Sequence, residues 1–261
     1  MKITVLGSGT STGVPQIGCR CEVCRSTDKR DKRLRCSSLV DVDGVKILID
    51  CGPDFREQML SVPFAKLDAV LITHEHYDHV GGLDDLRPYC NFGDVDVYAE
   101  EFCANHLRER IPYCFLPPEK RYPGVPSINL YNIEPHVPVT VKGVQIMPLR
   151  VMHGNLPILG YRIGDFAYIT DMKSIPETEY EYLNGVKLLF VNGLRHTMHY
   201  SHQTIEEAID FSRRVGAVDT YIIHMGHQIL PHESEQARLP EGFHLAYDGL
   251  VVEFPSSGVM K

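Results

Sequence analysis

Four side chains of the types that bind transition metals stand within six consecutive residues, in the order His74, His76, Asp78 and His79. Residues i and i+2 of an extended segment share one face, so His74 and His76 are placed to hold one metal ion. If the chain then turns into a helix, Asp78 and His79 can face a second ion beside the first. Imidazole and carboxylate are the usual ligands of Zn, Mn and Fe, so this spacing predicts a metal centre.

The elements that must position this cluster are short strands. The apolar run 69–72 leads directly into it, and three further polar residues follow strand-like runs: His153 after 144–151, Asp171 after 166–170, and His224 after 218–223. Side chains at strand ends on a rigid sheet are common sites of chemistry. Each residue alone would be read as a surface or capping residue. Together with the cluster they form a two-metal set.

The order of Asp50, the cluster 74–79, His153, Asp171 and His224 resembles the metallo-β-lactamase superfamily of binuclear metallohydrolases. The resemblance covers most of the chain. It implies an α/β fold, the αββα sandwich, in which two mixed sheets carry helices on their outer faces and the metals lie at one edge.

The resemblance also implies two ion sites that share one ligand. Each site takes three further ligands: His74, His76 and His153 for the first ion, and Asp78, His79 and His224 for the second. Asp171 would bridge the ions. Asp50 would orient a ligand histidine by a hydrogen bond. Asp68, just before the strand at 69–72, is a second candidate for this role, with a strand-end aspartate as the alternative.

The N-terminus is a strand over 2–6 followed by a Gly/Ser/Thr loop over 7–15. This loop lacks the lysine of a P-loop and does not match G-x-G-x-x-G, which argues against a nucleoside triphosphate or a dinucleotide. It resembles the opening of the ribonuclease Z and PhnP branches of the superfamily, which cleave phosphodiesters.

Three cysteines, Cys19, Cys21 and Cys24, follow this loop with C-x-C-x2-C spacing. In a reducing compartment such spacing indicates a zinc site rather than a disulfide framework. A tetrahedral structural site requires a fourth ligand. Three inert buried thiols are the alternative, since free cysteine is often a small core residue.

The cysteines resemble the structural zinc loop of PhnP, in which the fourth ligand is a histidine shortly after the last ligand of the catalytic site. His227, three residues after His224, occupies the matching position. The pair would connect the catalytic and structural metals through one loop. His232, Cys36 and Cys51 remain alternatives for the fourth ligand.

The segment 196–202 contains three histidines, and Ser201 is a candidate N-cap for an amphipathic helix over 203–211. His202 would then lie at a helix start near the metals. In PhnP and ribonuclease Z a histidine in this Ser-His context acts in catalysis without binding metal. We therefore expect His202 to stabilise the transition state and protonate the leaving oxygen, while Asp78 hydrogen-bonds the nucleophile and binds metal.

Chain-wide properties favour a soluble enzyme formed by one domain over 1–261. The sequence has 261 residues, is 43% hydrophobic, and contains no linker or low-complexity stretch. It shows neither a segment of membrane-spanning length nor a signal peptide, so we expect a cytoplasmic protein whose 8 cysteines stay reduced. Family analogy makes a homodimer plausible, and no patch of sequence identifies its interface.

We expect further helices over 82–90 and 100–110, and a long irregular loop over 111–135 that is rich in Pro and Tyr. The net charge of −8 disfavours a long nucleic acid as substrate, because proteins that bind many phosphates usually have a basic face.

Two adjacent metal ions, Zn or Mn, would lower the pKa of a bridging water, so that hydroxide can attack phosphorus near neutral pH. With one structural Zn in addition, the sequence predicts a phosphodiesterase for a small substrate, which the resemblance to PhnP implies to be cyclic. A tRNA 3′-processing endonuclease would carry a tRNA-binding arm that the sequence lacks. A lactone or thioester hydrolase uses the same metal set. A flavodiiron oxidoreductase would need a flavin domain, and a non-catalytic metal-binding module remains the alternative outside the enzymes.

Overall fold

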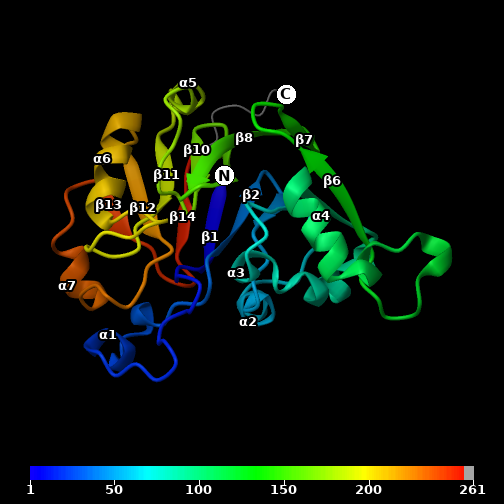
Figure 1. The fold of residues 1–261 in the computed structure, drawn as a ribbon, viewed down its shortest axis with the longest axis horizontal. Coiled ribbons are helices and arrows are strands. Elements are labelled where there is room, and N and C mark those ends of the chain that lie inside the picture. The colour runs from blue at the N-terminus through cyan, green and yellow to red at the C-terminus, as the bar shows by residue number, and fades with distance from the viewer. Residues whose placement is uncertain (256–261) are drawn as a thin grey trace.

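The computed structural model describes residues 1–255, and residues 256–261 of the expected domain lie outside the described part. Two sheets of seven strands each face one another (Figure 1). The first sheet has the order β14-β1-β2-β3-β4-β5-β6. Its strands are β1 (Lys2–Gly7), β2 (Ser37–Val42), β3 (Val45–Ile49), β4 (Ala69–Leu71), β5 (Val95–Glu100), β6 (Ile128–Ile133) and β14 (Val251–Glu253).

The second sheet has the order β13-β12-β11-β10-β9-β8-β7. Its strands are β7 (Val139–Val141), β8 (Val144–His153), β9 (Leu156–Ile163), β10 (Phe166–Ile169), β11 (Leu188–Asn192), β12 (Asp219–Ile223) and β13 (Phe243–Leu245). Both sheets are mixed: β3 to β6 and β10 to β13 run parallel, and the other neighbours run antiparallel.

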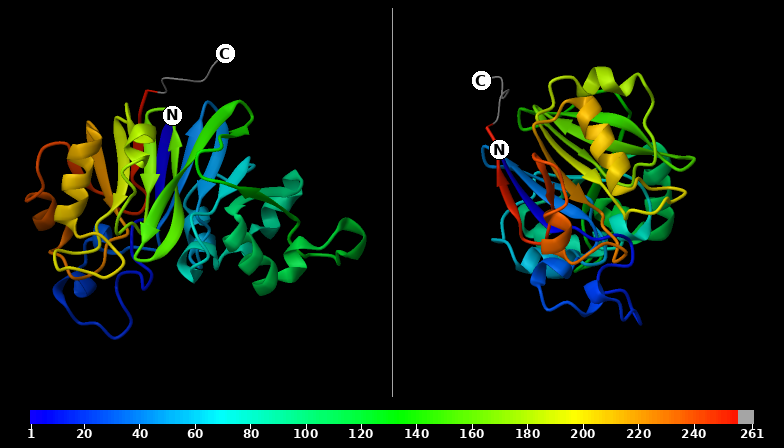
Figure 2. Two further views of the ribbon diagram at one scale, coloured as in Figure 1. Left: turned by 45° about the horizontal axis from the view of Figure 1, so that its top comes forward. Right: turned by 90° about the vertical axis from the view of Figure 1, so that its left-hand side faces the viewer.

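Helices cover the outer faces of both sheets (Figure 2). The α-helices are α1 (Glu22–Arg25), α2 (Phe55–Leu60), α3 (Tyr77–Val80), α4 (Glu101–Arg110), α5 (Glu179–Leu183), α6 (Ile205–Val215) and α7 (His232–Gln236). The 3-10 helices are η1 (Lys29–Asp31), η2 (Leu83–Phe92), η3 (Pro112–Phe115) and η4 (Pro118–Lys120).

The alternation of side chains along β3 shows how the layers form. Ile47 and Ile49 enter the core between the sheets, where they join Tyr161 and Phe190 of the second sheet. Leu48 points the other way and enters the core under α2, η2 and α4. Successive side chains of a strand face opposite sides, so the two faces of each sheet can contribute to two different hydrophobic cores. The expected αββα sandwich is confirmed.

Three local predictions need correction. The helix after the histidine-rich segment begins at Ile205, because Thr204 and Glu207 form a reciprocal capping box and Ser201 does not cap it. The segment 83–92 is a 3-10 helix that contains Pro88, which explains why it does not form an α-helix. The expected loop 111–135 contains strand β6, which pairs with β5 along its whole length.

Across residues 1–255, every helix is too short or too polar to cross a lipid bilayer.

Candidate metal centre

The predicted metal ligands meet at one edge of the sandwich, each at or just after the carboxyl end of a strand. His74 follows β4, His153 ends β8, Asp171 follows β10 and His224 follows β12. The first comes from one sheet and the other three come from the second. Parallel neighbours place their carboxyl ends at the same edge, so residues far apart in sequence converge there without long loops.

The ligand atoms fall into two groups that agree with the implied assignment. In each group the candidate atoms lie within 4.8 Å of one another: His74, His76 and His153 in the first, and Asp78, His79, Asp171 and His224 in the second. The second group is entirely buried, whereas His76 is exposed. One site is therefore sealed in protein and the other opens toward solvent.

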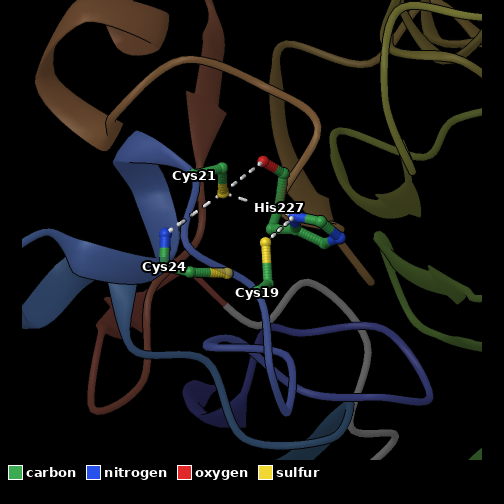
Figure 3. A group of neighbouring side chains, drawn as sticks. All are labelled: Cys19, Cys21, Cys24 and His227. Carbon is green, nitrogen blue, oxygen red and sulfur yellow. Dashed lines mark hydrogen bonds between the residues drawn. The ribbon is translucent and has the colours of Figure 1, made fainter.

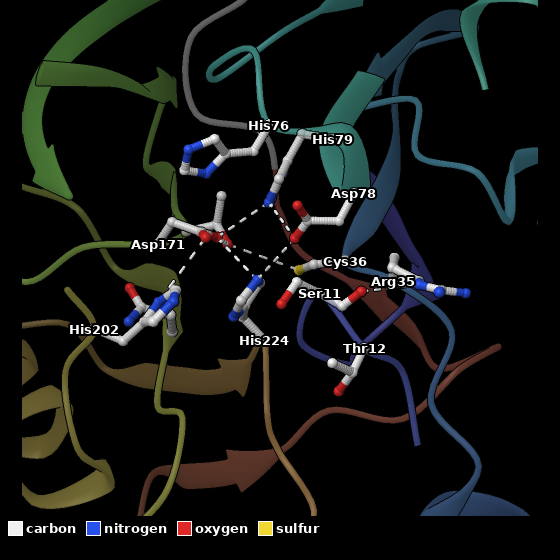
Figure 4. A network of polar contacts seen from close by, with 12 residues as sticks. Ser11, Thr12, Arg35, Cys36, His76, Asp78, His79, Asp171, His202 and His224 are labelled. Carbon is white, nitrogen blue, oxygen red and sulfur yellow. Dashed lines mark hydrogen bonds and ion pairs between the residues drawn. The ribbon is translucent and has the colours of Figure 1, made fainter. Parts of the chain in front are cut away.

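Asp171 joins the two groups through its two oxygens (Figure 4). Its Oδ1 lies 3.1 Å from Nε2 of His224 and 3.3 Å from Nε2 of His79. Its Oδ2 lies 4.0 Å from Nε2 of His74. A carboxylate whose two oxygens face two different ligand groups has the arrangement expected of a bridging ligand.

The charges and free nitrogen atoms of the second group are suited to binding divalent cations. Nε2 of His79 and Nε2 of His224 are buried and make no hydrogen bond to any described residue. Burial would lower the pKa of His79, but the carboxylates of Asp78 and Asp171 raise it well above its usual value. The same carboxylates would favour a divalent cation held by these residues. These donors are the N and O ligands that Zn and Mn accept.

The backbone at three of these positions adopts the left-handed conformation. The φ angles are 61° at Asp50, 56° at Asp171 and 55° at His224, although none of the three is glycine. This conformation costs on the order of 1 kcal/mol or more for such residues and concentrates at functional sites. Asp50 and His224 directly follow β3 and β12, and Asp171 comes two residues after β10, so this conformation turns the chain where each strand ends.

The expected hydrogen bond from Asp50 to a ligand histidine is present. Oδ2 of Asp50 accepts from Nδ1 of His79 at 2.7 Å, and Oδ1 accepts from the backbone N–H of Thr73 at 2.8 Å. The hydroxyl of Thr73 also bonds Asp50. Donation by Nδ1 leaves Nε2 of His79 without a proton for a metal, which is how such carboxylates fix a ligand.

Thr73 was missed by sequence reasoning. The signal that could have revealed it is a hydroxyl placed between a strand and the first ligand histidine, where it can reach both Asp50 and His74.

Asp68 is not brought to the site, and this expectation is corrected. It lies at the amino end of β4, whereas the ligands follow its carboxyl end. There it accepts from the backbone N–H of Lys46 at 2.9 Å and pairs with Nζ of Lys142 at 2.7 Å. Because Asp68 and the ligands lie at opposite ends of β4, Asp68 can stabilise the sheet but cannot hydrogen-bond a ligand histidine.

His202 lies beside the metal ligands and is buried. Its Nδ1 is 3.9 Å from Oδ2 of Asp171, and its ring stacks on that of His224 with centroids 4.9 Å apart. Burial, reinforced by the neighbouring His224, lowers the pKa of His202 to about 3, so the ring is neutral near pH 7. It also lies within ligand distance of His153 and Asp171, so the geometry leaves open metal binding as well as catalysis.

His153 is fixed in one tautomer by the backbone. Its Nδ1 lies 2.8 Å from the carbonyl oxygen of Asp171 and 2.9 Å from that of Ser201. Carbonyl oxygens only accept, so Nδ1 carries the proton and Nε2 is free for a metal. The bond to Ser201 also ties the loop that carries His202 to the metal site.

The predicted structural zinc ligands form a second cluster, separate from the first (Figure 3). Cys19, Cys21, Cys24 and His227 place their ligand atoms within 4.8 Å of one another. Nδ1 of His227 lies 3.3 Å from Sγ of Cys19 and 3.4 Å from Sγ of Cys21. Burial raises the pKa of Cys24 to about 11, so a thiolate there requires a cation to stabilise it. This donor set fits tetrahedral zinc.

The alternative fourth ligands lie elsewhere. Cys36 contacts Tyr168 in the central core, and Cys51 belongs to the core beneath α2 and η2. His232 packs against Tyr247, and its backbone N–H bonds Asp31. Of the four candidates, the structure brings His227 alone to the three cysteines.

Comparison with known proteins places this geometry in a family. The model of the β-lactamase superfamily domain matches residues 45–225, which is well over half of the chain. A solved structure described as a new diphosphatase from the PhnP family is 41% identical, with a TM-score of 0.89 over 97% of this chain and 96% of that chain. Zn²⁺-bound PqqB from Methylobacterium extorquens is 20% identical, with a TM-score of 0.79 over 97% of this chain and 100% of that chain, which shows a shared fold.

A curated relative, an octanoyltransferase of Porphyromonas gingivalis, is 49% identical over 99% of this chain. The match spans only 53% of that relative, so this chain corresponds to about half of it. The family match and the PhnP-family structure together carry the assignment: the chain belongs to the metallo-β-lactamase superfamily of metallohydrolases, in its PhnP-like branch.

Proposed function

We propose that the protein is a metal-dependent phosphodiesterase that acts on a small substrate, with a cyclic phosphodiester as the leading candidate. The observation that carries the proposal is the position of Asp171, whose two oxygens face two nearly complete ligand groups. This arrangement suits two ions that act on one phosphoryl group.

Two divalent cations held there would supply a water of lowered pKa and positive charge for a phosphoryl oxygen. The chain's own residues perform the remaining tasks. Asp78 is 11% exposed at its side chain and lies 3.2 Å from Nε2 of His79, so one carboxylate oxygen can bind a metal while the other accepts a hydrogen bond from the nucleophile. The buried ligands exclude bulk water from one side of the site.

His202 is assigned to the leaving oxygen. Because its pKa is about 3, the imidazole is neutral near pH 7 and acts by donating an N–H hydrogen bond rather than as a pre-formed acid. A hydrogen-bond donor aimed at developing negative charge is worth about 10²–10³ in rate in comparable sites. The earlier expectation of protonation is thus refined to hydrogen-bond stabilisation, with any proton transfer late in the step.

The solved structure that is 41% identical in sequence supports phosphorus chemistry, since that protein is described as a diphosphatase. A diphosphate and a phosphodiester both lose an oxygen leaving group from phosphorus. The net charge of −8 favours a small substrate over a polyanion. We therefore retain the cyclic diester as the first substrate to test, and a small diphosphate as the second.

A second candidate, hydrolysis of a medium-chain acyl thioester, follows from the octanoyltransferase of P. gingivalis. Only 53% of that protein is matched, so the named transfer can reside in its other half. The metal set is equally suited to attack on an acyl carbon. The two candidates differ in the atom attacked, which a substrate panel separates.

The test is turnover of bis(p-nitrophenyl) phosphate by protein that has been stripped with a chelator and reloaded with Mn or Zn. Parallel reactions contain a cyclic ribose phosphate, inorganic diphosphate and an octanoyl thioester at equal metal loading. Metal-dependent diester turnover that is lost in Asp171→Ala, but kept in the exposed control Asp210→Ala, supports the proposal. Turnover of the thioester alone would replace it with the second candidate.

A further inference from the structure

The Gly/Ser/Thr loop at the N-terminus lies against the metal ligands, although none of its residues belongs to the two ligand groups. The carbonyl of Ser8 accepts from the N–H of Met225 at 2.9 Å, and the N–H of Thr10 donates to the carbonyl of Met225 at 3.1 Å. Met225 directly follows the ligand His224. The loop therefore runs beside one ligand segment for three residues.

Arg35, which contacts this loop, also lies near the ligand segment that contains Asp78. An added Cβ at Gly52 would lie 2.1 Å from the carbonyl oxygen of Asp78 and 3.6 Å from Cβ of Arg35. Residues 52, 78 and 35 thus lie close together. Figure 4 shows Ser11 between Arg35 and His224, on the side of the ligands away from His202.

Thr10 to Gly13 form a tight turn, closed by the N–H of Gly13 donating to the carbonyl of Thr10 at 2.8 Å. Ser11 and Thr12 stand at its centre and are exposed. Throughout residues 1–255, no acceptor receives the backbone N–H of Ser11 or of Thr12. The turn thus offers two unused backbone donors, and the Ser11 hydroxyl beside them.

Arg35 braces this turn. Its Nε donates to the carbonyl of Ser11 at 3.1 Å, while its Nη1 bonds both carboxylate oxygens of Asp54, at 2.9 and 3.1 Å. The backbone N–H of Arg35 also bonds Asp54. A Cβ at Gly7 would lie 2.0 Å from the carbonyl oxygen of Arg35, so only glycine allows the loop to pack this closely. The donors are held in place before any ligand arrives.

We propose that the turn formed by residues 10–13 is a phosphoryl-binding subsite. The N–H groups of Ser11 and Thr12, with the Ser11 hydroxyl, donate to non-bridging oxygens of the substrate, while His202 faces the leaving oxygen from the other side. Backbone N–H groups of turns bind anions well, and hydrogen bonds to a charged oxygen are about twice as strong as neutral ones. Arg35 is a positioning residue. The inference rests on the proposed function and deepens it by naming the donors for the phosphoryl group.

The experiment uses the metal-loaded protein and two variants. Ser11→Pro removes the N–H and the hydroxyl, and proline suits the second position of a tight turn, so the turn should persist. Ser11→Asp is a second variant. Because residue 11 is exposed, this substitution should not disturb folding, and the added negative charge repels a phosphoryl group. Thr178→Asp, at the exposed N-cap position before the outer helix α5, is the matched control.

Two quantities are measured for each protein: kcat/KM with bis(p-nitrophenyl) phosphate, and the affinity for inorganic phosphate by calorimetry. We expect both to fall about tenfold in Ser11→Pro and further in Ser11→Asp, with metal content and thermal midpoint unchanged, and no effect of Thr178→Asp. Diester turnover with Ser11 variants equal to the parent in both quantities would overturn the subsite and leave the proposed function intact.

If the parent protein cleaves no phosphate ester, the proposed function fails and calorimetry alone decides the subsite. Weaker phosphate binding in both Ser11 variants then supports it, and equal binding overturns it. If Ser11→Pro does not fold, Ser11→Asp gives the same decision.

Discussion

The two metal-ligand clusters of this chain are built in opposite ways. The cluster around Asp171 collects residues from the ends of four strands in both sheets, and three of its residues and supports have left-handed backbones. The cluster of Cys19, Cys21, Cys24 and His227 lies outside the two sheets, on the short helix α1, the loop before it and the loop after β12, and two of its cysteines are half-buried.

From this difference we infer that the Asp171 cluster serves chemistry and that the sulfur cluster serves folding. The sulfur cluster offers four ligands to one ion, which closes a tetrahedron and leaves no position for substrate. The Asp171 cluster offers more than one ligand group and an exposed His76, and His202 lies beside it. The sheets fix the Asp171 cluster, whereas the sulfur cluster must itself hold in place the segment that carries it.

The substitution with the largest expected effect on activity is Asp171→Asn, which keeps the shape of the side chain and removes its charge. We expect kcat/KM to fall by on the order of 10³ or more, because the carboxylate that faces both ligand groups is lost. The thermal midpoint should change little, since the sheets hold the site. Steady-state kinetics and calorimetry measure the two quantities. Asp210→Asn, exposed on α6, is the control, and a similar loss there would contradict the assignment.

The opposite pattern is expected for Cys24→Ser. With one thiolate gone, the structural ion should be lost, and the segment 14–31 should open locally. Protection of its amides from exchange should fall on the order of a hundredfold, equivalent to about 3 kcal/mol, while strands keep theirs. Turnover should fall much less than in Asp171→Asn. Hydrogen exchange and metal analysis provide the readouts.

Cys103→Ser is the matched control for this variant, because Cys103 is buried under the first sheet, away from the zinc ligands. Loss of the structural ion in that control, or retention of it in Cys24→Ser, would show that the sulfur cluster is not the zinc site.

Sequence reasoning performed well where function and spacing coincide. The alternation i, i+2 predicted that His74 and His76 face one group, and the structure brings them together just after a short strand. The distant candidate ligands were recognised by their positions after β-rich runs, and they converge on the same place. His227 was predicted as the fourth zinc ligand from its distance to His224, and the structure brings it to the three cysteines. Periodicity alone indicated strands and helices, and the layered fold came from the family resemblance.

Three-dimensional facts with no one-dimensional signature were missed or misplaced. Asp68 and Asp50 each flank a short strand, yet the structure places them at opposite ends, and only the end at which the parallel strands finish carries ligands. Ser201 and Thr204 are both good N-caps, and the reciprocal bond to Glu207 decides between them. β6 is itself an edge strand of the first sheet and is only partly buried, so its apolar alternation is weak.

A smaller loss is expected from His202→Ala, which tests whether the Asp171 cluster contains a catalytic donor as well as ligands. We expect kcat to fall about 10²-fold with metal content unchanged. The loss should shrink for a diester whose leaving group is already acidic, such as p-nitrophenol, and grow for an alkyl leaving group. Comparing these two substrates tests the role at the leaving oxygen. A matching fall in metal content would instead make His202 a ligand, as its distance to His153 and Asp171 permits.

The smallest expected effect concerns the acid stability of the region behind the sulfur cluster. His232 is 3% exposed, and burial, together with the charges of Arg30 and Arg33, lowers its pKa from 6.5 to about 4. The folded protein therefore keeps this ring neutral while the unfolded chain protonates it near 6.5. Stability that is present above pH 6.5 is then lost as the pH falls toward 4, by about 1–3 kcal/mol in total.

Urea unfolding of the parent and of His232→Gln at pH 7 and pH 4.5 measures this loss. The variant should lose less stability on acidification than the parent, by about 1–2 kcal/mol, because its side chain takes up no proton. Release of zinc by acid affects both proteins, so their difference isolates the histidine. His244→Gln, at a half-exposed histidine, is the control. It should lose as much stability as the parent between pH 7 and pH 4.5. Equal losses in parent and His232→Gln would mean that the buried ring takes up no proton in this pH range, and would contradict the prediction.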